Sequence, residues 1–174
     1  MKPLLIGLAF ILFAGCARQQ NTAFDAALES KVASLQKQAD DSKPGLGEIM
    51  GVIEQHHAKL YYAGAKQNWP LASYELNEIQ ESLEDAMKLY PTPFNNVTVA
   101  LPQIIPSMTR GTIAGVRDAI EQKNEKSFVS AYEALSNSCS SCHAAENHPF
   151  IKITTPVPGM FSDQDFAPSR STGN

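Results

Sequence analysis

The hydrophobic positions of this chain repeat with the period of an α-helix from residue 46 onward. In residues 46–67 a side chain that suits a helix core recurs every three or four positions. This stripe consists of Leu46, Met50, Ile53, His57, Leu60 and Gly64. We expect the helix to end before the Asn68-Trp69-Pro70 sequence, which is typical of a turn.

Three further segments carry the same spacing. The second predicted helix ends at the prolines of residues 91–93, the third covers about residues 102–123, and the fourth begins near Glu125 and continues to His143. Their core stripes are Leu76, Ile79, Leu83, Met87 and Tyr90; Ile105, Met108, Ile113, Val116 and Ile120; and Phe128, Tyr132, Leu135 and Cys139. No sustained alternation of polar and apolar residues predicts a strand. The pattern therefore predicts an all-α protein in which residues 44–147 form an antiparallel four-helix bundle.

Two segments of different character flank the predicted bundle. Residues 16–43 are mostly polar, but they place an apolar stripe at helical spacing and end at a Lys-Pro-Gly stop. The stripe is Phe24, Leu28, Val32 and Leu35. We expect a helical tether, which either packs on the bundle or pairs with a second copy in a homodimer. Residues 148–174 are rich in proline and predict an irregular C-terminal tail.

The N-terminal segment, residues 1–15, is typical of a bacterial signal peptide. Lys2 precedes an uninterrupted run of apolar and small side chains over residues 4–14, which as a helix is about 16 Å long, about half of a bilayer core. The run ends at Cys16 in a sequence that resembles a lipobox, where cleavage leaves the cysteine to carry lipid. Because Ala17 follows, the sequence resembles lipoproteins sent to the periplasmic side of the outer membrane. The alternative is an ordinary signal peptide with an incidental Cys16.

Composition narrows the function further. The chain has 174 residues, of which 43% are hydrophobic and 18% are charged, as expected of one globular domain. Its 14 Lys and Arg against 18 Asp and Glu give a net charge of −4, which disfavours nucleic-acid binding. We find no Ser/His/Asp arrangement, phosphate-binding loop or paired carboxylates in the sequence, so it does not predict an enzyme.

The chemistry of the chain is concentrated in residues 139–143, Cys-Ser-Ser-Cys-His. A C-x-x-C-H run is the attachment sequence of c-type haem, in which two thiols add to the porphyrin vinyl groups and the histidine binds iron. Positions i, i+3 and i+4 share one helix face, so Cys139, Cys142 and His143 are expected to address one haem from the fourth helix. With Cys16 assigned to lipid, no thiol is left over.

Other interpretations of the cysteine pair need further features. A Cys139–Cys142 disulfide without haem is compatible with an oxidising compartment. A thioredoxin-like pair needs a βαβ context, and a zinc site needs a fourth ligand and usually a second cysteine pair. The alternative to a haem protein is therefore a haem-free accessory lipoprotein with a structural C-x-x-C.

With the motif Cys139 to His143 near the end of the last of four helices, the chain resembles the class II c-type cytochromes, meaning cytochrome c prime and its low-spin relatives. The resemblance covers about residues 46–147. It implies an exported four-helix bundle with one covalent haem c and with His143 as the proximal iron ligand. The chain departs from that family's pattern after the motif, because its tail is longer and rich in proline.

The resemblance also implies that a sixth iron ligand comes from the first helix of the bundle. His57 lies on the core stripe of that helix and is the expected ligand, whereas a hydrogen-bonded core histidine is its structural alternative. Met50, two turns away on the same face, is the alternative ligand, because low-spin relatives typically use a methionine near the start of this helix. Met160 in the tail is a further candidate, and high-spin relatives leave the site open.

Together these features predict a lipid-anchored, periplasmic, monohaem c-type cytochrome that carries single electrons between redox partner proteins, which the sequence does not name. The alternative haem protein is five-coordinate and binds NO or CO.

Overall fold

The computed structural model describes residues 7–95, 97–157, 159–161 and 163–168, with side chains from residue 22 onward. The chain divides into two units, residues 1–43 and residues 44–174. The division falls at the Lys-Pro-Gly sequence that the pattern predicts as a helix stop.

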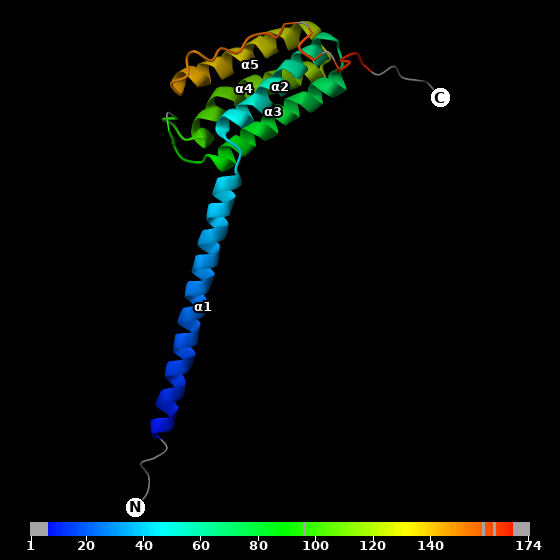
Figure 1. Ribbon diagram of the computed structural model, residues 1–174. Helices are drawn as coiled ribbons and strands as arrows, with labels where there is room; N and C mark the ends of the chain where they lie inside the picture. The colour runs from blue at the N-terminus through cyan, green and yellow to red at the C-terminus, as the bar shows by residue number, and fades with distance from the viewer. Residues whose placement is uncertain (1–6, 96, 158, 162, 169–174) are drawn as a thin grey trace, which may run out of the picture. The chain divides into compact units, whose positions relative to one another are not determined.

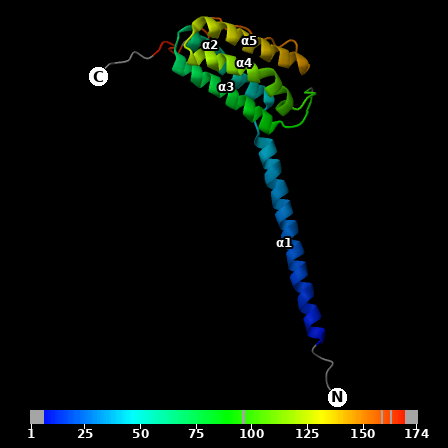
Figure 2. The ribbon, with the colours of Figure 1, turned by 180° about the vertical axis from the view of Figure 1, so that it is seen from behind.

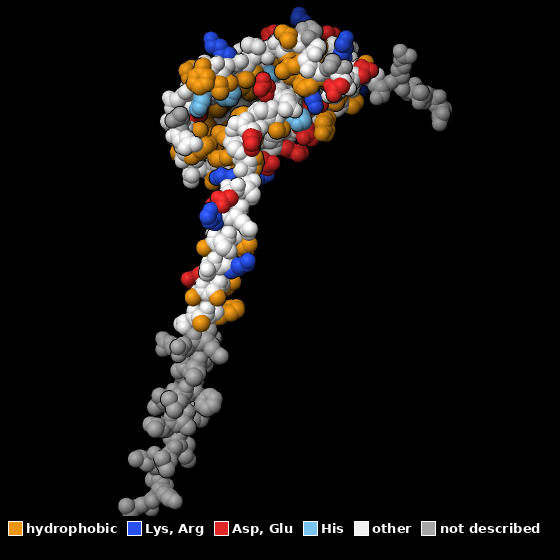
Figure 3. All heavy atoms as spheres, in the orientation of Figure 1, with side chains coloured by type: hydrophobic (Ala, Val, Ile, Leu, Met, Phe, Trp, Pro, Cys, Tyr) orange, Lys and Arg blue, Asp and Glu red, His pale blue; other side chains and the backbone are white. Residues whose placement is uncertain are grey.

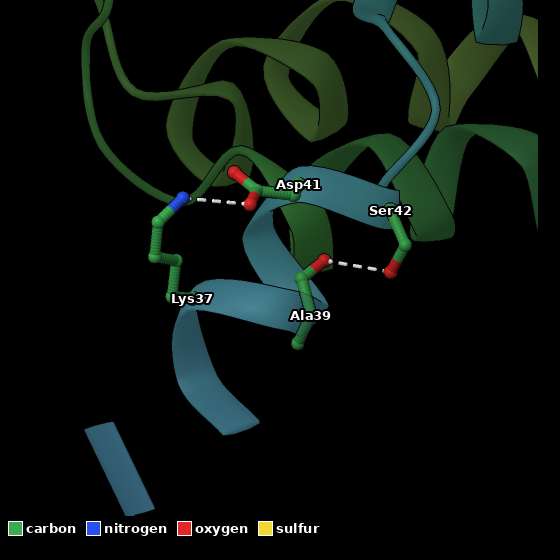
Figure 4. Close-up of polar contacts among 4 residues, drawn as sticks. All are labelled: Lys37, Ala39, Asp41 and Ser42. Atoms are coloured by element: carbon green, nitrogen blue, oxygen red, sulfur yellow. Dashed lines mark hydrogen bonds and ion pairs between the residues drawn. The ribbon is translucent and has the colours of Figure 1, made fainter. Parts of the chain in front are cut away.

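The first unit holds one long helix, α1, which spans Gly7–Ser42. The tether predicted for residues 16–43 is therefore helical along nearly its whole length. Each of the four side chains in its apolar stripe is at least 50% exposed. Figure 3 shows hydrophobic side chains among charged and polar ones along this helix. Near its end the Lys37 ammonium lies 2.8 Å from the Asp41 carboxylate, and the Ser42 hydroxyl donates to the Ala39 carbonyl at 3.1 Å (Figure 4). Such exposed contacts add little to stability.

The predicted signal peptide and lipid anchor fall largely outside the described residues. Residues 1–6 and the side chain of Cys16 are not described, so the lipobox interpretation stays a prediction. In the part of the chain that is described, no helix combines the length and the apolar character that crossing a bilayer requires.

The second unit contains four helices, which confirms the all-α prediction. They are α2 (Leu46–Ala65), α3 (Trp69–Leu89), α4 (Leu101–Glu121) and α5 (Glu125–Ala145). Residues 7–95, 97–157, 159–161 and 163–168 contain no named strand, only one isolated bridge between Phe94 and Val97.

Short polar connections join α2 to α3 and α4 to α5 and form two helical hairpins. Between α2 and α3, Gln67 takes a left-handed backbone conformation with φ 57°, and the Asn68 side chain then accepts the Leu71 N–H at 3.3 Å to cap α3. The connection between α4 and α5 repeats this chemistry, with φ 53° at Lys123 and a capping side chain at Asn124. Each pair therefore folds back on itself.

The four helices pack as an antiparallel bundle (Figures 1 and 2). Helix α2 packs on α3, α3 on α4 and α4 on α5, and a contact between α2 and α5 closes the bundle. Each predicted stripe points inward. The largest fully buried side chains are Tyr132, Phe128, Leu60, Leu76, Ile79, Leu135, Glu75 and Val116.

Two contacts define how α2 and α5 lie against each other. The backbone of Gly64, at the end of α2, meets the ring of Phe128, at the start of α5. Seven residues earlier in α2, His57 is hydrogen-bonded to Tyr132 and Ser136, which lie one and two turns later in α5. The two helices are therefore antiparallel, and each step back along α2 corresponds to an equal step forward along α5.

The C-terminal tail is irregular, as predicted, but it packs on the bundle. The described residues after α5 contain no helix, yet Phe166 is only 9% exposed and belongs to the hydrophobic core. The Asn68 side chain, which caps α3, also donates to the carbonyls of Phe166 and Ala167. The tail is thus part of the folded unit.

Replacing Gly64 by alanine should destabilise the bundle. A Cβ atom at this position would overlap the fully buried Phe128 ring, so the ring or the α2–α5 spacing must shift. We expect a loss of about 1–3 kcal/mol in the free energy of unfolding, measured by urea denaturation. Gly51→Ala on the same helix is the matched control, because its Cβ meets nothing within 4 Å, and it should be neutral or stabilising. Equal effects of the two substitutions would contradict the close contact at Gly64.

Candidate functional site

The cysteines and the histidine of the C-x-x-C-H motif lie in the last two turns of α5. Because α5 is continuous through Ala145, Cys139, Cys142 and His143 share one face, as the sequence predicted. Both thiols are free and half-buried, and both pack against the hydrophobic core. The structure therefore aligns the three side chains as an attachment motif requires.

The surroundings of the two thiols favour their protonated form. Burial raises the pKa of Cys139 to about 11, and the neighbouring Cys142 adds to this. Burial also raises the pKa of Cys142, and the Glu146 carboxylate contributes in the same direction. At neutral pH both groups are uncharged thiols, which are weak nucleophiles and weak ligands for zinc.

The imidazole of His143 is half-buried and neutral. Burial lowers the pKa of His143, although a hydrogen bond to the Ile151 backbone opposes this. Its Nδ1 atom is buried and has no hydrogen-bond partner among the described residues. A neutral imidazole is the form that binds iron.

His57, the expected sixth ligand, is hydrogen-bonded in the core at both ring nitrogens. Its Nδ1 lies 2.8 Å from the Tyr132 hydroxyl and its Nε2 lies 3.0 Å from the Ser136 hydroxyl. The side chain is 5% exposed, and burial lowers the pKa of His57 to about 4. Because Ser136 precedes His143 by seven residues, His57 lies about 10.5 Å along α5 from the motif histidine. The described contacts do not bring these two histidines together.

Met50, the alternative ligand, lies at the level of the motif. His57 and Met50 are seven residues apart and share one face of α2, and Ser136 and His143 are related in the same way on α5. His57 lies opposite Ser136. Because α2 and α5 are antiparallel, moving seven residues back along α2 to Met50 corresponds to moving seven residues forward along α5 to His143. Met50 is half-buried against the core, whereas Met160 in the tail is 51% exposed.

His56, which precedes His57, faces a different helix. Its Nδ1 lies 2.7 Å from a carboxylate oxygen of Glu75, which is only 2% exposed, and its Nε2 lies 3.8 Å from Glu78. This partly buried pair joins α2 to α3. It therefore belongs to the side of α2 that turns away from α5.

Glu146 is a residue of this region that sequence reasoning missed. It is 5% exposed, and its Oε2 accepts hydrogen bonds from the Thr98 backbone at 2.6 Å, the Thr98 hydroxyl at 3.2 Å and the Val99 backbone at 3.3 Å. Its second oxygen is buried with no hydrogen-bond partner in the described part of the chain. Glu146 holds the connection before α4 against the end of α5. Its position four residues after Cys142, on the same helical stripe, was the available signal.

No family model matches this chain, and no curated protein or solved structure is significantly similar to it. Within the described residues, no cluster of three or more His, Cys, Asp or Glu side chains is arranged to hold a metal ion by itself.

The side chains present fit a covalent haem by their chemistry. A thioether bond needs two reduced cysteines on one helix face, which Cys139 and Cys142 supply. An axial iron ligand needs a neutral imidazole beside them, which His143 supplies. The apolar contacts of both cysteines face the core, where water is excluded.

The engaged, neutral state of His57 predicts a specific pH dependence of stability. The unfolded chain binds a proton at His57 near pH 6.5, whereas burial lowers the pKa of this residue in the folded chain to about 4. The stability that neutral His57 contributes is therefore fully present above pH 6.5, and it is lost as the pH falls toward 4. Lowering the pH from 7 to 4.5 should reduce the free energy of unfolding by about 2–3 kcal/mol through His57 alone.

Urea unfolding of the wild type and of His57→Gln at both pH values measures this contribution as the difference between their pH dependences. An NMR titration of the His57 ring in the wild type gives its pKa directly. Identical pH dependences for the two proteins would contradict the assignment.

Proposed function

We propose that this protein is a monohaem c-type cytochrome that carries single electrons, with the haem attached to α5. The observation that carries the proposal is the C-x-x-C-H motif in an unbroken helix, with both thiols free, half-buried and turned toward the bundle core. A bound haem supplies one-electron exchange at its iron, at a potential that the protein tunes.

The proposed roles of the motif residues follow from their surroundings. Cys139 and Cys142 would hold the haem through two thioether bonds, each S–H adding across a vinyl group, and the uncharged thioethers would suit the apolar contacts of both residues. The neutral imidazole of His143 would hold the iron as its protein ligand on this side. Glu146 fixes the end of α5 by holding the backbone at Thr98 and Val99.

For the sixth ligand the helix register favours Met50 over His57. Met50 shares the level of His143, whereas His57 lies about two turns away and would have to break two buried hydrogen bonds to bind iron. With Met50 rather than a second histidine as ligand, the haem would have a higher reduction potential. In this proposal His57 positions α2 against α5.

The proposed setting is the periplasmic face of the outer membrane. A lipid on Cys16 would anchor the chain, and α1 would serve as the tether between the anchor and the bundle. The redox partners are proteins that approach the exposed part of the bundle, and the exposed stripe of α1 leaves a homodimer compatible with this proposal.

Purification from a host that attaches c-type haem tests the central proposal. We expect a coloured protein whose mass exceeds that of the mature polypeptide and its lipid by one haem. Cys139→Ala with Cys142→Ala should remove both colour and added mass. A colourless wild type of polypeptide and lipid mass alone would contradict the proposal and favour a haem-free lipoprotein with a structural C-x-x-C.

The ligand assignment is tested by replacing methionine in the haem-loaded protein. Met50→Leu should convert a low-spin absorption spectrum to a high-spin one that responds to CO. Met87→Leu, a half-buried methionine of α3, is the matched control and should leave the spectrum unchanged. If His57→Gln alone produced the high-spin form, His57 would be the ligand. A wild type that is already high-spin and binds CO would instead favour the five-coordinate gas-binding function.

A further inference from the structure

The tail forms a strap across the face where α2 and α5 meet. We use this name for the described residues after α5, namely 148–157, 159–161 and 163–168. The strap leaves the end of α5 and follows the bundle back toward the end of α2, as the orange and red segment in Figure 1 shows. It begins at the C-x-x-C-H motif and ends beside the cap of α3.

At its far end the strap is held mainly by aromatic side chains. The Tyr62 hydroxyl donates to the Val157 carbonyl, and the Tyr62 ring packs at 5.1 Å from Phe166 and at 6.3 Å from Phe161. The Lys59 ammonium lies 5.3 Å from the centre of the Phe161 ring. These contacts fix the strap on the outer side of α2.

At the motif end the strap is held by polar contacts. The Ser140 hydroxyl, inside the C-x-x-C-H sequence, accepts the Ile153 N–H at 2.9 Å and donates to the Ser136 carbonyl at 3.0 Å. Two residues earlier, the Ile151 backbone lies beside the His143 ring, where it raises the pKa of that imidazole. The Ser140 hydroxyl therefore ties the strap directly to the motif.

Of the two serines in the motif, Ser140 contacts the strap, whereas Ser141 bonds to its own helix. Ser141 is exposed, and its hydroxyl donates to the Asn137 carbonyl of its own helix at 2.8 Å. Ser140 is half-buried and reaches a segment thirteen residues away. The motif itself requires neither serine side chain, so the contact of Ser140 with the strap is a property of this chain.

We propose that the strap is a lid over the α2–α5 face of the haem site and that Ser140 is its clasp. This inference rests on the proposed function. A closed strap keeps water and small ligands such as CO from the site, and release of the clasp opens the motif end while the aromatic contacts at Tyr62 hold the other end. Ser140 thereby sets how often the site opens.

Ser140→Ala tests the clasp in the full-length, haem-loaded protein, with Ser141→Ala as the matched control. Loss of the hydroxyl should speed amide hydrogen exchange at Ile153 about five- to tenfold, and the control should leave it unchanged. In the reduced Met50→Leu background, where the sixth position is free, Ser140→Ala should raise the CO association rate by the same factor, because access through the open lid follows its population.

Tyr62→Phe gives a second variant that loosens the opposite end of the strap without touching the motif. It should speed exchange in the strap near Val157 and also raise the CO association rate. Unchanged exchange at Ile153 in Ser140→Ala would overturn the clasp, and faster exchange with an unchanged CO rate in both variants would overturn the lid. A colourless protein would overturn the proposed function together with the lid, and this outcome is distinct from a coloured protein with an unresponsive strap.

Discussion

The hydrogen bonds that the His57 imidazole makes with the Tyr132 and Ser136 hydroxyls determine how α2 lies against α5. Apolar helix faces tolerate repacking, because one buried aliphatic side chain can replace another. A buried imidazole with two defined partners does not tolerate it, since a slip by one turn would leave polar groups unpaired at about 1–3 kcal/mol each. The same register sets the contact of Gly64 with Phe128 at one end and the level of Met50 with His143 at the other. The position of the candidate site thus depends on a polar contact about two turns away from it.

Hydrogen bonds to two different segments fix the turn of α5 that carries the motif, and they restrict where its side chains can point. On one side Glu146 binds the backbone of Thr98 and Val99, which belongs to the connection between α3 and α4. On the other side Ser140 binds the strap. Neither residue is among the proposed attachment or iron-binding groups, yet both limit the motion of the turn that carries Cys142 and His143. A site whose supporting residues are fixed in this way loses little conformational freedom when a cofactor binds.

The sequence predicted the helices, their core stripes and the motif, because each depends on spacing within one segment. It favoured His57 over Met50 as the sixth ligand, although the two share a face of α2 and differ only in what lies opposite on α5. That information depends on contacts between residues more than seventy positions apart. The roles of Glu146 and Ser140 were missed for the same reason, as a polar residue near a stripe does not reveal its partner. The strap was predicted only as irregular, because its attachment to Tyr62 joins residues 95 positions apart.

The surroundings of the motif also separate the chemistries that a C-x-x-C-H sequence can serve. A zinc site or a thiol–disulfide enzyme needs thiolates, which are stabilised by positive charge and by access to water. Here burial disfavours the charged form of both cysteines, and the Glu146 carboxylate disfavours it further at Cys142. A thioether carries no charge, so the same apolar contacts that penalise a thiolate stabilise the covalently attached state. Under the proposed function these surroundings favour thioether attachment over ionic ligation, and the neutral His143 beside the cysteines would be the group that binds metal.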